Sequence, residues 1–121
     1  MFLAAINKHK GPNMTFQDIA AQFQAAESGT DSFKRLYKDA FHLAETEVEN
    51  AGLYFVIAVI AQAYVRRYED EAVPTELANR AKALLEKFNA KIVAGLAGDA
   101  ATRVRLLGEV ANEYQARVTD F

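Results

Sequence analysis

The stretch from Asn50 to Val65 carries no charged residue and separates an acidic segment from the pair Arg66-Arg67. Projected onto a helix, this stretch places apolar side chains on every side, which is typical of a helix buried all round. We therefore expect a buried central helix, around which the rest of the chain is arranged.

An amphipathic pattern before this stretch predicts a helix over about residues 16–27. Thr15, with Asp18 three residues later, resembles a capping box at its start. The helix should end at a Ser-Gly-Thr segment, where Gly29 is able to take the left-handed conformation common just past a helix. Before it, residues 2–9 are expected to form a short helix or an apolar arm.

The following helix should begin near Ser32, and its apolar face continues to Val65 without a change of phase. We therefore favour one uninterrupted or kinked helix over residues 32–68. It would be about 55 Å long, against about 30 Å for the other helices. A second subunit would then cover its excess apolar surface. The alternative is that the chain turns at Gly52 and forms a compact bundle. The apolar face consists of Phe33, Leu36, Tyr37, Ala40, Ala44, Val48 and Ala51.

Two more helices are predicted after Pro74, which cannot continue a helix. The first should run from Thr75 to Gly95 and the second from a cap at Asp99, and their short link makes them antiparallel neighbours. The stripe expected to be buried on the first consists of Leu77, Ala81, Leu84, Leu85, Phe88 and Ile92. The inner face expected on the second consists of Ala101, Val104, Leu107, Ala111, Tyr114 and Val118.

Length and composition agree with this pattern. A chain of 121 residues with 51% hydrophobic and 25% charged residues fits one soluble domain, residues 1–121. No segment shows sustained alternation of apolar and polar residues, so a sheet is not supported. We predict an all-α fold, a small bundle of four to five helices around a long or kinked central apolar helix. The absence of cysteine excludes disulfides and thiolate nucleophiles.

The charge pattern bears on possible partners. The net charge is −2 and there is no basic tail, so we expect no nucleic-acid partner. Arg66-Arg67 could form a small basic patch with Arg103 and Arg105, but acidic residues are interspersed. The uncharged stretch is shorter than the about 20 apolar residues of a membrane span, so we expect no membrane insertion. The apolar N-terminal opening is too short for a signal peptide, and a cytoplasmic location is therefore expected.

No catalytic or phosphate-binding motif is present, so we expect neither enzymatic activity nor a cofactor. His42, Glu45 and Glu49 have a helical spacing that could present ligands to a divalent metal. The order of the ligands is reversed relative to the Glu-x-x-His pairs of di-iron bundles, and the face points outward. A solvated polar face explains the three residues better, and no metal site is predicted.

Two polar residues project onto the apolar side of the central segment. A buried Glu47 would have a raised pKa and would be a candidate functional residue. We prefer the alternative, in which Glu47 lies at the rim and reaches water. Gln62 raises the same question, and it could instead fix helix register or a dimer contact.

The leading functional hypothesis is a non-enzymatic helical protein-interaction module that forms a homodimer through its central helix. The alternative is a small-molecule-binding module in which tyrosines and Phe55 line an apolar pocket near Glu47. The candidate partner or ligand surface consists of Tyr37, Glu47, Leu53, Tyr54, Phe55, Ile60, Gln62 and Tyr64.

Overall fold

The computed structural model describes residues 14–121, which contain helices and no strand, as the all-α prediction requires. The α-helices are α2 (Phe16–Ala25), α3 (Thr30–Thr46), α4 (Ala51–Tyr68), α5 (Thr75–Leu96) and α6 (Ala100–Arg117). Two short 3-10 helices, η2 (Val48–Asn50) and η3 (Val118–Asp120), follow α3 and α6. The helix or arm expected over residues 2–9 lies outside the described residues.

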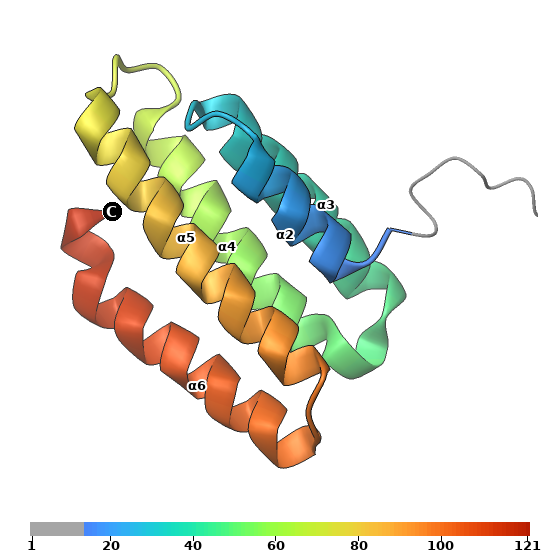
Figure 1. Ribbon diagram of the computed structural model, residues 1–121. Coiled ribbons are helices and arrows are strands. Elements are labelled where there is room, and N and C mark those ends of the chain that lie inside the picture. Colours follow the sequence, from blue (N-terminus) through green and yellow to red (C-terminus); the bar gives the residue numbers. More distant parts are fainter. Residues whose placement is uncertain (1–13) are drawn as a thin grey trace, which may run out of the picture.

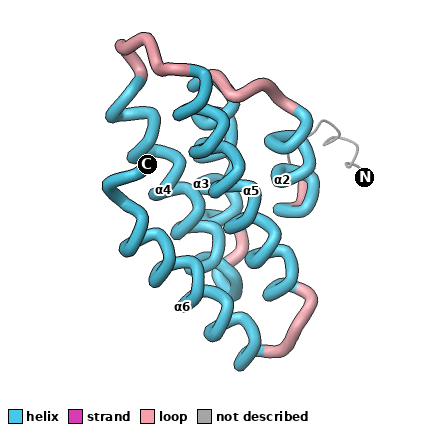
Figure 2. The backbone as a smooth tube through the Cα atoms, turned by 60° about the vertical axis from the view of Figure 1, so that its left-hand side comes forward, coloured by secondary structure: helices cyan, strands magenta, loops and turns pink. Residues whose placement is uncertain are grey.

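Successive helices run in alternating directions along one common axis (Figure 1). Helices α2 to α5 form a four-helix arrangement, because α3 packs on α2 and α4, and α5 contacts both of the same helices. Helix α6 lies against α5 and α4 on the outside of this arrangement (Figure 2). The predicted bundle around an apolar central helix is therefore confirmed, as is the antiparallel pair at its C-terminal end.

Side-chain caps mark the starts of two helices, α2 and α6. The Thr15 hydroxyl accepts a hydrogen bond from the Asp18 amide, and the Asp18 carboxylate accepts one from the Thr15 amide, which completes the predicted capping box. Asp99 caps α6 by accepting from the Thr102 amide at 2.9 Å. The left-handed conformation predicted for Gly29 is wrong. Its φ is −72°, because this glycine is the N-cap of α3 rather than the C-cap of α2.

The prediction of one uninterrupted or kinked helix over residues 32–68 is also wrong. Helix α3 ends at Thr46, and Glu47 leaves the helical region with φ −126° and ψ 88°. One 3-10 turn then reverses the chain, so that α3 and α4 form an antiparallel hairpin with the largest contact in the bundle. The compact alternative is confirmed, although the turn precedes Gly52, which lies in the first turn of α4.

The core forms where α4 meets its neighbours. The Tyr64 ring stacks on Phe33 with ring centroids 4.1 Å apart, and the Tyr54 ring stacks on Phe16 at 5.7 Å. The predicted α5 stripe is buried except for Leu77, which is half-buried. The prediction that the central helix is buried on all sides is wrong, because one side of α4 is not covered by any described helix.

Helix α6 is rotated relative to the sequence prediction. Its buried residues are Leu106 and Val110, whereas the Val104 side chain is 70% exposed. Salt bridges from Lys87 to Glu113 and from Lys91 to Glu109 hold the adjoining side of α6 against α5. The apolar stripe predicted to face inward therefore lies largely at the surface.

Candidate functional site

The uncovered side of α4 carries exposed aromatic and branched residues. The side chains of Phe55 and Val59 are 55% and 38% exposed, although both belong to the most apolar helix of the chain. The Phe55 ring contacts Phe41 of α3 at 5.8 Å between centroids, and Phe41 contacts Tyr37 at 6.1 Å. An aromatic cluster thus extends from α4 onto α3 at the surface.

Helix α6 extends this apolar surface on the other side of α4. An open hollow of about 530 Å³ lies between α3 and α4 and includes Gly52 and Phe55 in its lining. A second pocket, between α4 and α6, shares Gly52 and includes Val104 and Leu107. The two are therefore parts of one surface, here called the outer face. It consists of Phe41, Ala44, Gly52, Phe55, Val59, Val104, Leu107 and Ala111.

Charged residues bound the outer face at both ends of α4. At its N-terminal end the exposed carboxylates of Glu45 and Glu49 line the two pockets. At the opposite end, Arg66 is exposed and follows Phe55 and Val59 at helical spacing. The uncharged part of the surface therefore lies between an acidic and a basic boundary.

The structure divides the residues of the predicted site into two groups. Leu53, Tyr54, Ile60 and Tyr64 are buried in the core, although Leu53 also lines the pocket between α4 and α6. Phe55 is exposed, while Tyr37 and Gln62 are half-buried. Burial raises the pKa of the Tyr64 hydroxyl, as expected of a phenol inside the core. Phe55 is thus the predicted residue that lies most clearly on the outer face.

Glu47 is exposed at the turn after α3, so a buried carboxylate is wrong and the preferred rim position is confirmed. Its Oε1 accepts a hydrogen bond of 2.8 Å from the hydroxyl of Tyr54. Burial, followed by this hydrogen bond, raises the pKa of Tyr54 to about 12. The tyrosines and Phe55 expected to line one pocket, namely Tyr37, Tyr54, Tyr64 and Phe55, do not converge, because Tyr54 and Tyr64 are core residues and Phe55 is exposed.

The arrangement suggested for a metal does not persist in the fold. His42 and Glu45 lie on α3 with Nδ1 and Oε1 4.0 Å apart, but Glu49 belongs to η2 beyond the end of that helix. Glu49 instead approaches Arg103 on α6. Within residues 14–121, no group of three or more His, Cys, Asp or Glu residues could hold a metal ion.

The four arginines considered as a basic patch lie at opposite ends of the molecule. Arg66 and Arg67 are in the last turn of α4, where Arg67 donates to the carbonyl oxygen of Phe121 at 2.9 Å. Arg103 and Arg105 are near the start of α6, where Arg105 forms an ion pair with Glu109. They do not gather into one surface that could follow a phosphate backbone.

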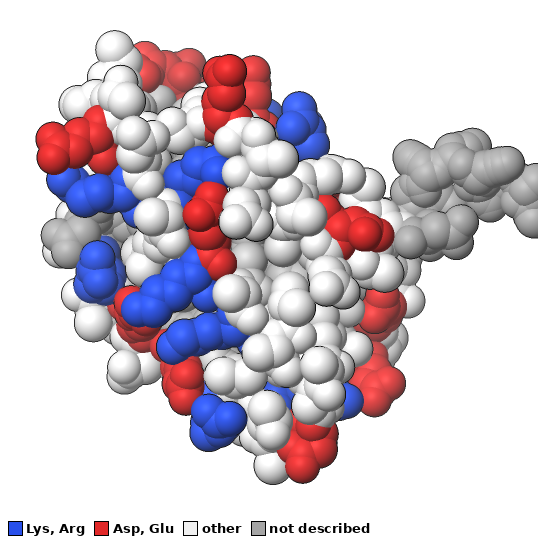
Figure 3. Space-filling model, in the orientation of Figure 1, with Lys and Arg blue, Asp and Glu red and all other residues white. Residues whose placement is uncertain are grey.

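The face formed by α5 and its neighbours is different in character. Lysines and arginines lie beside acidic residues over α5 and α6, and an uncharged strip separates them from α2 (Figure 3). This strip contains a groove of about 380 Å³ between α2 and α5. Asn89 lines it, yet its side chain is only 2% exposed and neither amide atom has a hydrogen-bond partner among the described residues.

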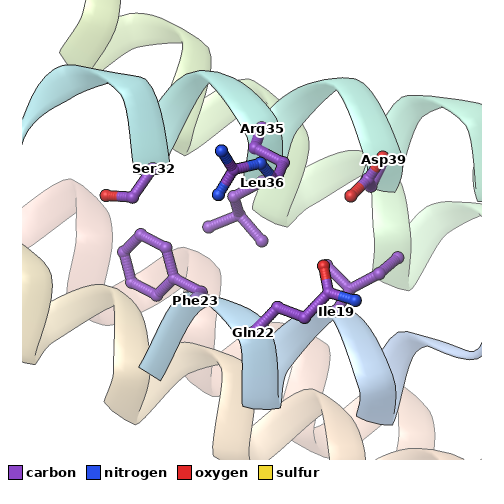
Figure 4. Close-up of a pocket in the computed structure, with 7 residues that line it drawn as sticks. All are labelled: Ile19, Gln22, Phe23, Ser32, Arg35, Leu36 and Asp39. Atoms are coloured by element: carbon purple, nitrogen blue, oxygen red, sulfur yellow. The ribbon is translucent and has the colours of Figure 1, made fainter. Parts of the chain in front are cut away.

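A smaller hollow lies between α2 and α3, whose side chains point toward one another across it (Figure 4). Its volume is about 10 Å³, which is space for about one water molecule. It is lined by Ile19, Gln22, Phe23, Ser32, Arg35, Leu36 and Asp39. This hollow is too small for an organic ligand.

Sequence reasoning missed two residues of the pocket between α4 and α6. Asn50 was considered only as the first residue of the uncharged stretch, and Arg103 only as part of a basic patch. In the fold both residues line the same pocket, together with Leu53, Val104 and Leu107. No local pattern signals this, because the pocket forms only when α6 returns to the start of α4.

One helical stretch of the described chain, Val48–Tyr68, is long and apolar enough to cross a membrane by length and composition. Less than half of it is buried in the bundle. Length and composition are shared by membrane spans and by core helices of soluble bundles, so they do not assign either role.

No protein-family model matches the chain. No curated protein and no solved structure matches it either.

Proposed function

We propose that the protein is a non-enzymatic interaction module that forms a homodimer through the outer face. The observation that carries this proposal is that the solvent side of α4 has no charged residue from Gly52 to Ala63, while Phe55 and Val59 are exposed on it. Apolar surface left in water costs about 25 cal/mol per Å² relative to burial. Contiguous apolar patches of this kind are typical of protein interfaces.

A second copy of the chain fits this face because its features are self-complementary. Val59 lies midway along α4 between Gly52 and Arg66. A twofold axis at Val59 would place Arg66 of one copy beside Glu45 and Glu49 of the other. Basic and acidic boundaries would then meet at both ends of the interface.

The same operation matches side-chain sizes across the interface. Phe55 of one copy would lie over Ala63 of the other, so that a large side chain meets a small one. The two α4 helices would run antiparallel, with the Val59 side chains in contact at the axis. Alternation of large and small residues across facing helices allows close packing.

Sedimentation velocity at micromolar concentration tests the homodimer. We expect the unsubstituted protein to be a dimer, and Phe55→Lys to raise its dissociation constant at least about tenfold, because dimerisation would bury an unpaired ammonium group. Ala83→Lys adds the same charge at an exposed position of α5 and should leave the dimer intact. This pair separates loss of the interface from a general effect of charge.

Two outcomes would contradict the proposal. One is an unsubstituted protein that sediments as a compact monomer at these concentrations. The other is a dimer that Phe55→Lys leaves unchanged. A monomer that co-floats with phosphatidylcholine vesicles, and loses this property on the Phe55→Lys substitution, would assign the outer face to a lipid surface instead.

A further inference from the structure

The pocket between the starts of α4 and α6 contains two polar atoms with unused hydrogen-bonding capacity. Its volume is about 210 Å³. The Asn50 Oδ1 and the Arg103 Nε are both buried, and neither has a hydrogen-bond partner among the described residues. One is an acceptor and the other a donor, and they come from different elements of the fold. Buried polar atoms without partners are uncommon and call for a reason.

The guanidinium group of Arg103 is only partly engaged. Its Nη2 donates to the carbonyl oxygen of Gly98 at 3.2 Å. Its Nη1 is 3.8 Å from Oε2 of Glu49, whose side chain is 80% exposed, so this ion pair is long and solvated. The group therefore keeps the capacity to bind a carboxylate, which is the anion whose geometry suits its parallel N–H groups.

The Asn50 side chain is a neighbour of Tyr54, since it lowers the pKa of that tyrosine against the larger, opposite effect of burial. The Tyr54 hydroxyl donates to Glu47. The Asn50 Oδ1 has no hydrogen-bond partner among the described residues, and both Asn50 and Glu49 line the pocket. An acceptor beside a carboxylate is suited to an ammonium group.

We propose that this pocket binds a free α-amino acid with an apolar side chain. The carboxylate of the ligand is bound by Arg103, and its ammonium group by Asn50 Oδ1 with Glu49 nearby. Its side chain lies on the apolar wall of Leu53, Val104 and Leu107. A pocket that presents one cation and one anion matches a zwitterion better than an ion of either sign. This pocket is part of the outer face, which the proposed dimer would cover, so binding is measured in the Phe55→Lys variant.

Calorimetric titration with L-leucine, L-methionine and L-phenylalanine tests the site. We expect at least one of them to bind, with affinity at least about tenfold higher than that of 4-methylpentanoate or 3-methylbutylamine, which lack the ammonium and the carboxylate respectively. In amide NMR spectra, the bound ligand should shift the resonances of Gly52, Leu53, Val104 and Leu107. Absence of binding by all three amino acids, equal binding of either analogue, or shifts confined to another surface would overturn the proposal.

Substitutions in α6 give an independent test. Arg103→Gln should weaken binding at least about tenfold, whereas Arg105→Gln, which changes an exposed arginine paired with Glu109, should not. If Arg103→Gln does not fold, Val104→Trp serves instead, because this largely exposed position can carry an indole that fills the pocket. Binding that persists in either folded pocket variant would overturn the proposal. Phe55 does not line this pocket, so Phe55→Lys leaves the site intact whether or not the unsubstituted protein dimerises, and failure of the dimer and failure of this site are distinguishable.

Discussion

At the scale of single residues, Tyr54 links the turn after α3 to the core. Its pKa is raised to about 12 by burial and by its hydrogen bond to Glu47, whereas an ordinary tyrosine titrates near 10.0. Because the folded state disfavours the phenolate, protonated Tyr54 contributes to the free energy of unfolding. This contribution is fully present below pH 10 and is lost as the pH rises through about 12.

Tyr54→Phe should therefore show a smaller loss of stability between pH 10 and about 12 than the unsubstituted protein. At neutral pH it should lower the free energy of unfolding by about 1 kcal/mol, the net value of one hydrogen bond. Urea unfolding at neutral pH and at about pH 11 measures both effects. An identical pH dependence in the two proteins would show that Tyr54 does not carry the effect.

Asn89 offers a second test at this scale. Both amide atoms of this buried residue are without hydrogen-bond partners among the described residues. Asn89→Leu removes these atoms and keeps a similar volume, so it should raise the free energy of unfolding by about 1–3 kcal/mol. Asn112→Leu, at an exposed position of α6, should change it by less than about 0.5 kcal/mol. A loss of stability in Asn89→Leu, measured by urea unfolding, would show that the amide is satisfied in solution.

At the scale of elements, the helices that were predicted correctly are those with local signals. The Thr15–Asp18 box and the Asp99 cap act within one turn of the chain, so they are visible in the sequence. The break after Thr46 is not, because Glu47 is no helix breaker and the apolar phase continues past it. The hairpin of α3 and α4 arises from packing of the two helices on each other, and a one-dimensional period does not contain that contact.

Only part of the candidate site was predicted from the sequence, and the reason is related. Phe55 was recognised from the apolar character of α4, but the sequence gives no sign of which side of α4 stays uncovered. On α6 the apolar stripe through Val104 and Ala111 was identified, and its orientation was wrong. Contacts of α6 with α4 and α5 bury Leu106 and Val110 instead, and this leaves the predicted stripe at the surface.

Glycines in and before α6 provide a prediction for this element. Gly108 is an exposed residue within the helix, and a Cβ added there would meet nothing within 4 Å. Gly108→Ala should therefore raise the free energy of unfolding by about 1 kcal/mol, because alanine is the better helix former. Gly98→Ala should lower it, since its Cβ would lie 2.8 Å from the Thr102 Cγ2. Thermal unfolding of both variants checks this, and equal melting temperatures would contradict it.

At the scale of the whole molecule, charge is distributed unevenly around the bundle. Over α5 and α6, lysines and glutamates form ion pairs across the surface (Figure 3). On the outer face, Glu45 and Glu49 lie at the N-terminal end of α4, where Arg103 of α6 approaches Glu49, and Arg66 lies at the opposite end. Electrostatic complementarity of this kind sets the orientation of two copies more than the strength of their contact.

The antiparallel register of the proposed homodimer can be tested by reversing these charges. Arg66→Glu should place a glutamate beside Glu45 of the other copy and weaken dimerisation, by about 1 kcal/mol for each contact. Glu45→Arg should weaken it similarly, and the double variant should recover most of the loss, because the opposite charges face each other again. Sedimentation equilibrium at low salt measures the dissociation constants. Recovery is expected only if residues 45 and 66 are neighbours across the axis at Val59. Losses of dimerisation free energy that simply add in the double variant would therefore exclude this register. An apolar dimer of another geometry would still be tested by Phe55→Lys.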